Sequence, residues 1–194
     1  MRFLIMLFVF VAFAFANPAP LGFEIDKATY EQVTAKYQPK STEKSYTGGT
    51  LIYIDKDKIE LENLISDVRL NFDTQGKLVA VWLEFDGNHF SKLLPSLSKK
   101  YTKIIEKTDN FIKFEENDCT IALKLSSIIY ADIATLQQKI EQHGIQVIEE
   151  LERDITYLSY STKKEAERRK EWRDKYKKEQ NEREQRIKDN LKTL

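Results

Sequence analysis

The sequence predicts an α+β protein: a mainly antiparallel sheet with helices packed on one face, plus a long charged C-terminal helix. Three observations lead to this prediction. Apolar residues alternate along several short segments joined by turns, which is typical of antiparallel strands. Segments with helical spacing are interspersed among them, as expected for helices layered on a sheet. The last 33 residues contain no glycine or proline and are mostly charged, which indicates an extended helix.

A β-hairpin over residues 67–86 is the clearest predicted element. Val68, Leu70 and Phe72 alternate before the turn Asp73–Gly76, where glycine supplies a positive φ. The following residues 78–85 are almost all apolar, which predicts a well-buried second strand.

The other predicted elements alternate between strands and helices. Either Asp26 or the Thr29-x-x-Gln32 pair can cap a short helix that Gln38-Pro39 ends. Asn88 is a candidate cap for a second helix, which Pro95 weakens or kinks. A third helix is predicted between Asp132 and Gly144. Further strands are predicted at 21–25, at 46–55 with a bend or bulge at Gly48-Gly49, and at 111–116, 119–130, 145–150 and 155–161. The order strand-turn-strand-helix occurs from Asp67 and again from Phe111, without a residue-level match.

The N-terminus has the pattern of a signal peptide. Arg2 precedes an apolar run from Phe3 to Ala16, which ends in the small-x-small triplet Ala14-Phe15-Ala16. At 14 residues the run is shorter than the roughly 20 that cross a bilayer, so cleavage is favoured over a retained anchor. We therefore expect three parts: a signal peptide at 1–16, an α+β domain at 17–161 and a charged helix at 162–194. The expected location is periplasmic or secreted, after cleavage near Ala16.

The two predicted parts of the mature chain carry opposite charge. Residues 162–192 hold 13 basic and 8 acidic side chains, a net charge of +5. Residues 17–161 hold 17 basic and 23 acidic side chains, a net charge of −6. Such an asymmetry indicates a surface that meets a partner, without naming it.

One resemblance to known proteins follows from the first half of the body. The segment LGFEIDKATYEQVTAKY, the strand GKLVAVWLEF and a helix ending in KKY lie between Leu21 and Tyr101. This pattern resembles the small exported domains of Gram-negative envelopes, of the BamE/SmpA-like and β-lactamase-inhibitor-like kinds. The resemblance implies a binding or scaffolding module. The chain departs from BamE in lacking a lipobox cysteine and in carrying the long tail.

The sequence gives little support to an enzyme. His89 and His143 lack a second ligand at metal-binding spacing, no phosphate-binding or nucleophile motif occurs, and no cofactor is predicted. Cys119 lies in an alternating segment and is predicted to be a buried small residue rather than a reactive thiol. The alternative is an envelope hydrolase that uses surface carboxylates. Its candidates are Glu60 with Glu62, Glu115 with Glu116, and the group Glu149, Glu150 and Glu152.

The C-terminal segment is predicted to be helical without support from the body. A capping box at Thr162-x-x-Glu165 specifies its start. Acid-before-base pairs at i, i+4 each stabilise an isolated helix by about 0.2–0.5 kcal/mol. Six such pairs occur: Glu165–Arg169, Glu171–Lys175, Asp174–Lys178, Glu179–Arg183, Glu182–Arg186 and Glu184–Lys188.

Four apolar residues form a narrow stripe along this helix, and they are the predicted partner-binding residues: Trp172, Tyr176, Ile187 and Leu191. The stripe is too thin for a robust coiled coil. Three uses remain open, namely a solvated single helix, docking on a protein or a second copy, and contact with an anionic surface. Acidic residues interleave with the basic ones, so nucleic acid is not expected and membrane contact is weakly supported. We expect a non-enzymatic interaction module, with the hydrolase or a structural spacer to membrane or cell wall as alternatives.

Overall fold

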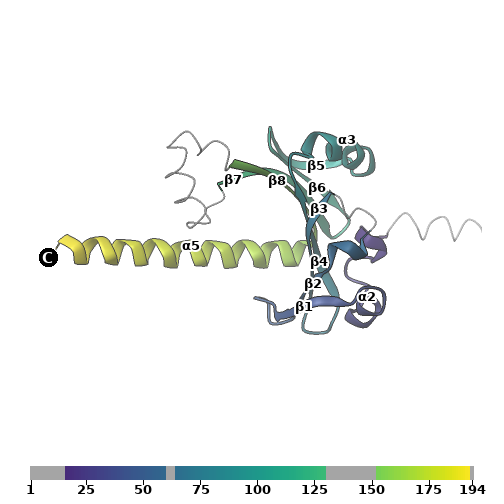
Figure 1. Ribbon diagram of the computed structural model, residues 1–194, viewed down its shortest axis with the longest axis horizontal. Coiled ribbons are helices and arrows are strands. Elements are labelled where there is room, and N and C mark those ends of the chain that lie inside the picture. The colour runs from purple at the N-terminus through teal and green to yellow at the C-terminus, as the bar shows by residue number, and fades with distance from the viewer. Residues whose placement is uncertain (1–15, 60–63, 130–151, 193–194) are drawn as a thin grey trace, which may run out of the picture.

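The predicted α+β architecture is present in the computed structural model, which describes residues 16–59, 64–129 and 152–192. Helices α2 (Tyr30–Lys36) and α3 (Phe90–Lys100) pack on one face of an eight-stranded antiparallel sheet. Helix α5 (Lys163–Lys192) leaves the sheet on the side opposite to α2 and α3 (Figure 1). The predicted fold class and the predicted C-terminal helix are therefore confirmed.

All the strands of this sheet pair in antiparallel fashion, in the order β1-β2-β3-β4-β8-β7-β6-β5. Their bounds are β1 (Pro39–Lys44), β2 (Thr50–Ile54), β3 (Ile65–Phe72), β4 (Leu78–Asp86), β5 (Lys103–Thr108), β6 (Phe111–Glu116), β7 (Cys119–Ile129) and β8 (Glu152–Thr162). The predicted hairpin corresponds to β3 and β4. The predicted strands at 111–116, 119–130 and 155–161 correspond to β6, β7 and β8. Of the strand predicted at 46–55, only Thr50–Ile54 forms β2, and Gly48-Gly49 lie in the turn between β1 and β2 rather than in a bulge.

Within the described residues the chain runs twice through the same order, a helix followed by four strands. The first unit comprises α2 and β1 to β4, and the second comprises α3 and β5 to β8. The units meet where β4 pairs with β8, so each unit runs from an edge of the sheet to its centre. The repeat therefore begins with a helix, and not at Asp67 and Phe111 as the order of predicted elements suggested.

The ends of α2 and α3 show this correspondence in detail. Tyr37 and Tyr101 each follow the last helical residue, are buried, and adopt the same extended conformation. The backbone N–H of Tyr37 donates to the carbonyl of Val33 at 2.8 Å, and that of Tyr101 donates to the carbonyl of Leu97 at 2.7 Å. Both tyrosines thus end a helix and lead into an edge strand.

The core lies between the sheet and the two covering helices. Alternate residues of the strands point into it, as the period of two requires. Its largest fully buried apolar side chains include Phe72 and Phe114, and Val33 and Leu97 enter from α2 and α3. Cys119 is fully buried in this cluster as a free thiol, which confirms its predicted burial.

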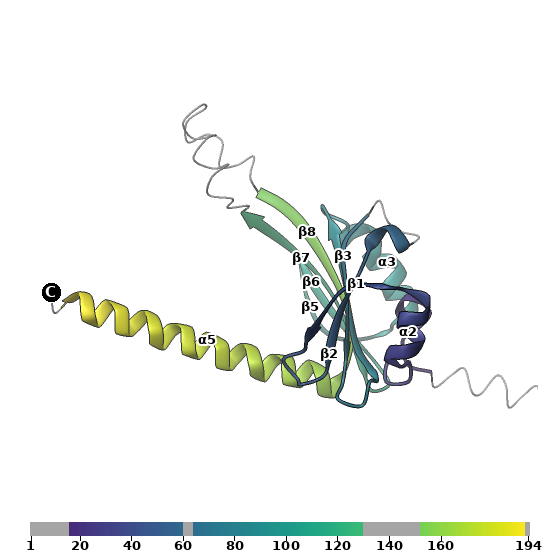
Figure 2. The same ribbon diagram turned by 60° about the horizontal axis from the view of Figure 1, so that its bottom comes forward.

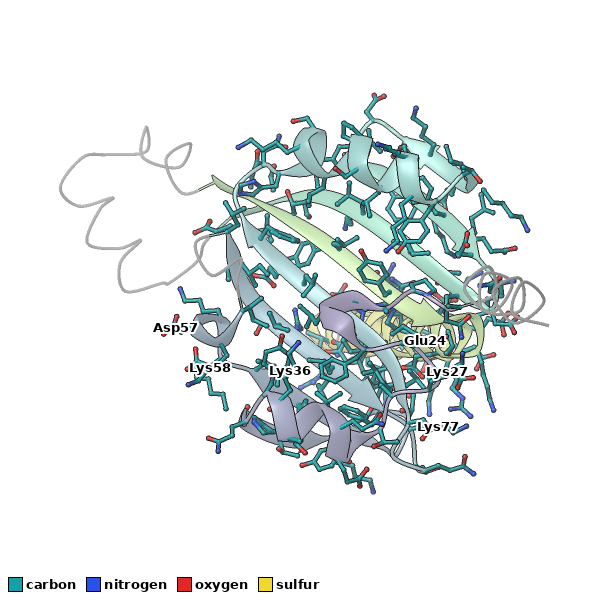
Figure 3. All side chains as sticks on the ribbon, turned by 90° about the vertical axis from the view of Figure 1, so that its right-hand side faces the viewer. Glu24, Lys27, Lys36, Asp57, Lys58 and Lys77 are labelled. Carbon is teal, nitrogen blue, oxygen red and sulfur yellow. The ribbon has the colours of Figure 1, made fainter. Side chains whose placement is uncertain are left out.

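The segment before α2 differs from its prediction. Residues 21–25 do not form a strand; a 3-10 turn, η1 (Pro20–Gly22), holds Leu21 at a φ of 58°. Ile25 is buried, and Lys36 reaches back from α2 to the carbonyl of Leu21 at 3.3 Å. Figure 3 shows Lys36 on this helix-covered face of the molecule, with Glu24 and Lys27 close together beside the sheet. The alternation of apolar residues here reflects a coil packed on the core.

The two edge strands were not predicted. Every described side chain of β5 is exposed, and β1 is exposed except for its first residue. A second correction concerns the cap of α3, which is His89 rather than Asn88 and makes no side-chain capping bond. The capping box of Thr29 and Gln32 is confirmed. Residues 1–15 of the predicted signal peptide, the helix predicted from Asp132 and the strand predicted at 145–150 lie outside the described residues.

None of the helices in the described part of the chain combines the length and apolar character needed to span a bilayer.

Candidate interaction surface

Helix α5 begins directly at the end of β8, in the middle of the sheet. The backbone N–H of Lys163 donates to the carbonyl of Asp118 at 2.7 Å, and its Nζ lies 3.3 Å from a carboxylate oxygen of Glu115. The backbone N–H of Glu165 donates to Oγ1 of Thr162 at 3.1 Å, as in the predicted capping box. The first turn of α5 is therefore bound to the β6–β7 hairpin before the helix leaves the sheet.

The side chain of Glu165 completes a different interaction from the one predicted. It accepts a hydrogen bond from the hydroxyl of Tyr46, in the β1–β2 turn, and one from Nδ2 of Asn71, in β3, at 2.8 Å. Glu165 is only 2% exposed. A buried carboxylate needs such donors because burial without them is costly. Of the two bonds of the predicted capping box, the one from the N–H of Glu165 to Thr162 forms. The carboxylate of Glu165 binds Tyr46 and Asn71 instead of the backbone of Thr162, and so anchors α5 to the sheet.

Electrostatic contacts extend this anchor by one turn. The guanidinium of Arg169 lies over the ring of Trp82, 5.5 Å from its centroid, on the sheet face from which α5 departs. Desolvation lowers the pKa of Arg169, while the charge of Glu165 acts in the opposite direction. Burial and the hydrogen bond to Glu165 raise the pKa of Tyr46, so the phenol stays neutral and able to donate.

Trp172 and Tyr176, the first half of the predicted stripe, lie together at the edge of this anchor. Their rings stack with centroids 5.4 Å apart and an interplanar angle of 14°. The Tyr46 ring lies 5.6 Å from that of Trp172 on the body side. Trp172 nevertheless remains 47% exposed and Tyr176 49% exposed. The body therefore supports this aromatic pair without covering it.

The second half of the stripe lies further along α5, away from the body. Ile187 is 52% exposed. Leu191 belongs to the helix, but its side chain lies outside the described part of the structure. Figure 2 shows α5 projecting from the end of β8, away from the face that carries α2 and α3. The structure thus brings Trp172 and Tyr176 together and separates them from Ile187.

Four residues of the anchor were not identified from the sequence: Tyr46, Asn71, Trp82 and Arg169. The usable signal was the spacing of α5 itself. Glu165 and Arg169 continue the 3–4 spacing of Trp172 and Tyr176 toward the N-terminus, so all four lie on one side of the helix. The change from aromatic to charged residues toward the N-terminus of α5 marks the point where this side of the helix meets the body.

The ion pairs of α5 differ in part from those predicted. Glu165 is bound by Tyr46 and Asn71, and so serves the anchor. Lys175 and Glu179 pair at 3.9 Å in the base-before-acid order. Nε of Arg186 donates to the backbone carbonyl of Glu182 at 3.3 Å. These contacts are exposed, and each contributes little to stability.

The carboxylates and histidines considered for catalysis or metal binding lie at several separate places in the structure. Glu115 pairs with Lys103 and Lys163, and the Lys103 contact, followed by the Lys163 contact, holds its pKa below the usual range. His89 binds the carbonyl of Asp86 through its ring at 2.9 Å. In the described ranges no group of three or more His, Cys, Asp or Glu could hold a metal ion. Glu116 lies half-buried at the end of β6, next to Glu115. The other candidates lie outside the described residues or have side chains that do: Glu60, Glu62, His143, Glu149, Glu150 and Glu152.

A surface cavity of about 440 Å³ lies beside the first turn of α5. Four acidic and four basic side chains line it, so neither sign of charge dominates: Asp26, Asp73, Asp118, Glu165, Lys77, Lys163, Lys164 and Arg168. Figure 3 shows Lys77, one of these lining residues, at the rim of the sheet. The mixture of charges favours a hydrated cleft over a site for a single ion.

The fold and site together define a class: an antiparallel α+β protein whose described residues form two helix-plus-four-strand units, with a long helix that projects from the central strand β8. Comparison with protein-family models, with curated proteins and with solved structures finds no match to this chain. The resemblance to BamE/SmpA-like and β-lactamase-inhibitor-like domains therefore stays a prediction.

Proposed function

We propose that this chain is an exported, non-enzymatic interaction module that presents α5 to a protein partner or to a second copy. The observation that carries the proposal is the state of Trp172 and Tyr176. They form a stacked pair on a helix fixed at its base, and about half of each side chain faces solvent. Large aromatic side chains held in place in this way are typical anchors of protein interfaces, because they lose little conformational entropy on binding.

The base of α5 supports the same proposal. Glu165 accepts two hydrogen bonds from the body, and Arg169 packs on Trp82. These contacts set the direction in which the helix leaves the sheet. Pre-ordering of a binding surface improves affinity, because the ordering cost is met during folding.

A spacer is a second candidate function, favoured by the length of α5. Thirty residues of α-helix extend roughly 45 Å at 1.5 Å per residue. The net positive charge of this segment could then hold it on an anionic lipid or wall surface. In that case the basic side chains would matter more than the aromatic pair.

Capture experiments with the immobilised full chain separate these functions. Envelope extract and anionic vesicles are each passed over three proteins: the wild type, the double variant Trp172→Ala/Tyr176→Ala, and the matched control Lys170→Ala/Asp174→Ala. The control residues are exposed and lie on the opposite side of α5. We expect specific protein capture to be lost only in the aromatic variant. Equal capture by all three proteins would overturn the proposal, and vesicle binding that is insensitive to the aromatic pair would support the spacer.

A further inference from the structure

We infer that the partner of α5 is a second copy of this chain, whose α5 packs against it in antiparallel orientation. The inference rests on the proposed function and specifies its partner. It starts from the stripe, which continues the side of the helix that docks on the body. At 100° per residue, the positions from Trp172 to Leu191 at 3–4 spacing fall within a sector of about 100°. These positions are Trp172, Tyr176, Gln180, Arg183, Ile187 and Leu191.

The spacing of these positions is symmetric about a point between Asn181 and Glu182. A two-fold axis through that point places Trp172 opposite position 191 of the second copy. It places Tyr176 opposite Ile187, and Gln180 opposite Arg183. Every apolar position of one helix therefore meets an apolar position of the other, and each isologous contact occurs twice.

The flanking charges agree with this register. In an antiparallel pair, Glu179 lies beside Arg186 of the second copy, and Lys177 lies beside Glu184. The two-fold symmetry doubles both contacts, which gives four pairs of opposite charge. Residues that flank the seam set the orientation of paired helices. The charge complementarity is thus a property of the described helix itself.

A parallel pair lacks these advantages. It would place Arg183 against Arg183 within the seam and Glu179 beside Glu184 of the second copy. Both contacts bring like charges together, which destabilises paired helices. The sequence of α5 therefore favours the antiparallel arrangement over the parallel one.

The geometry leaves room for both bodies. The symmetry point is about 28 Å along the helix from Lys163, so the two sheets lie at opposite ends of the paired helices. The contact spans about 30 Å of helix and has polar central positions at Gln180 and Arg183. Polar seam positions fix register at a cost in stability. We expect a reversible dimer with a dissociation constant in the micromolar range, as for small interfaces.

Sedimentation velocity of the full chain over a range of concentrations tests the dimer and its charges. Glu179→Lys should weaken dimerisation about tenfold, because each of its two contacts becomes repulsive. The double swap Glu179→Lys/Arg186→Glu should restore it to within about twofold of the wild type. Asp174→Lys makes the same charge change on the opposite face and should have no effect. A wild type that stays monomeric at all concentrations overturns the inference, as does a double swap that remains weak.

Disulfide formation tests the orientation independently. Gln180→Cys and Arg183→Cys are prepared as separate full-length proteins, with the buried Cys119 left in place. In the antiparallel register, a mixture of the two forms a cross-linked dimer, whereas each protein alone does not. Cross-linking of each protein with itself would show a parallel pair and overturn the inference. One outcome separates this inference from the proposed function. If the wild type stays monomeric but captures a protein that the Trp172→Ala/Tyr176→Ala variant does not, only this inference fails and the proposed function stands.

Discussion

Nδ2 of Asn71 donates a hydrogen bond to Oε1 of Glu165 at 2.8 Å, across 94 residues of sequence. Asn71 lies in β3, and Glu165 lies in the first turn of α5. Because both side chains are buried, this bond ties a projecting helix to the interior of the sheet. The helix is therefore fixed in direction at its base, while its outer turns have no support from the described part of the body.

The anchor predicts a stability effect for Glu165→Gln. Both donors bond Oε1 of Glu165, so the amide oxygen of glutamine can still accept both bonds, but without the negative charge that strengthens them. Hydrogen bonds to a charged group contribute about 1.5–3 kcal/mol and neutral ones about 0.5–1.5 kcal/mol, so we expect a loss of unfolding free energy of about 1–3 kcal/mol. Urea denaturation measures it. Glu167→Gln is the control, because Glu167 is exposed and lies two residues further on, on the opposite side of the helix. Equal midpoints for the two variants would contradict the anchor.

The close approach of the β1–β2 turn to β3 predicts a large effect for Gly49→Ala. A Cβ at Gly49 would lie 1.9 Å from the carbonyl oxygen of Phe72, so the backbone must shift. We expect a loss of at least about 1–3 kcal/mol, because overpacking against backbone cannot relax through a rotamer change. Gly48→Ala serves for comparison, because its Cβ would make only an ordinary contact with Thr74 at 3.7 Å, although φ is +89°. Thermal unfolding should place Gly49→Ala well below Gly48→Ala, and the reverse order would contradict the packing.

Cys119 should be inert in the folded protein. Burial raises its pKa to about 12, and nearby Asp26 adds to the shift. At pH 8.5 an ordinary thiol is about half ionised, so native Cys119 should react with a thiol reagent at least about a thousandfold more slowly than in concentrated urea. The folded pKa lies above the unfolded value. The folded state therefore favours the neutral thiol of Cys119. Its contribution to the free energy of unfolding is complete below pH 8.5 and is lost as the pH rises toward 12. Rapid native labelling at pH 8.5 would be inconsistent with the burial.

The aromatic pair should matter little for folding. Trp172 and Tyr176 are each about half exposed, and their main contact with the body is the ring of Tyr46. We expect Trp172→Ala/Tyr176→Ala to lower the unfolding free energy by no more than about 1 kcal/mol. Urea denaturation and circular dichroism check this. A loss as large as that of Glu165→Gln would mean that the pair belongs to the core.

Local signals allowed most of the sheet and helices to be predicted. The capping box of Thr29 and Gln32 and the turn at Asp73–Gly76 depend only on neighbouring residues, and both form as expected. The edge strand β1 was missed because its side chains are nearly all exposed, so no alternation of apolar residues marks it. Residues 21–25 alternate for another reason, since they pack on the core as a coil.

The candidate surface was predicted only in its local part. The spacing of Trp172 and Tyr176 identified the exposed stripe. The role of Glu165 depended on Tyr46 and Asn71, which are distant in sequence. The capping-box pattern gave Glu165 a local acceptor role, and the structure instead directs its carboxylate to two donors of the body. A single sequence contains no signal for that pairing.

Hydrogen exchange along α5, measured at low and at high protein concentration, tests the central claim most directly. That claim is that α5 is anchored at its base and associates through its outer stripe. We predict that amides in the turn of Glu165 to Arg169 are protected at both concentrations. Amides from Trp172 to Leu191 should gain protection only at the higher concentration. Equal and rapid exchange along the whole helix at both concentrations would contradict the account.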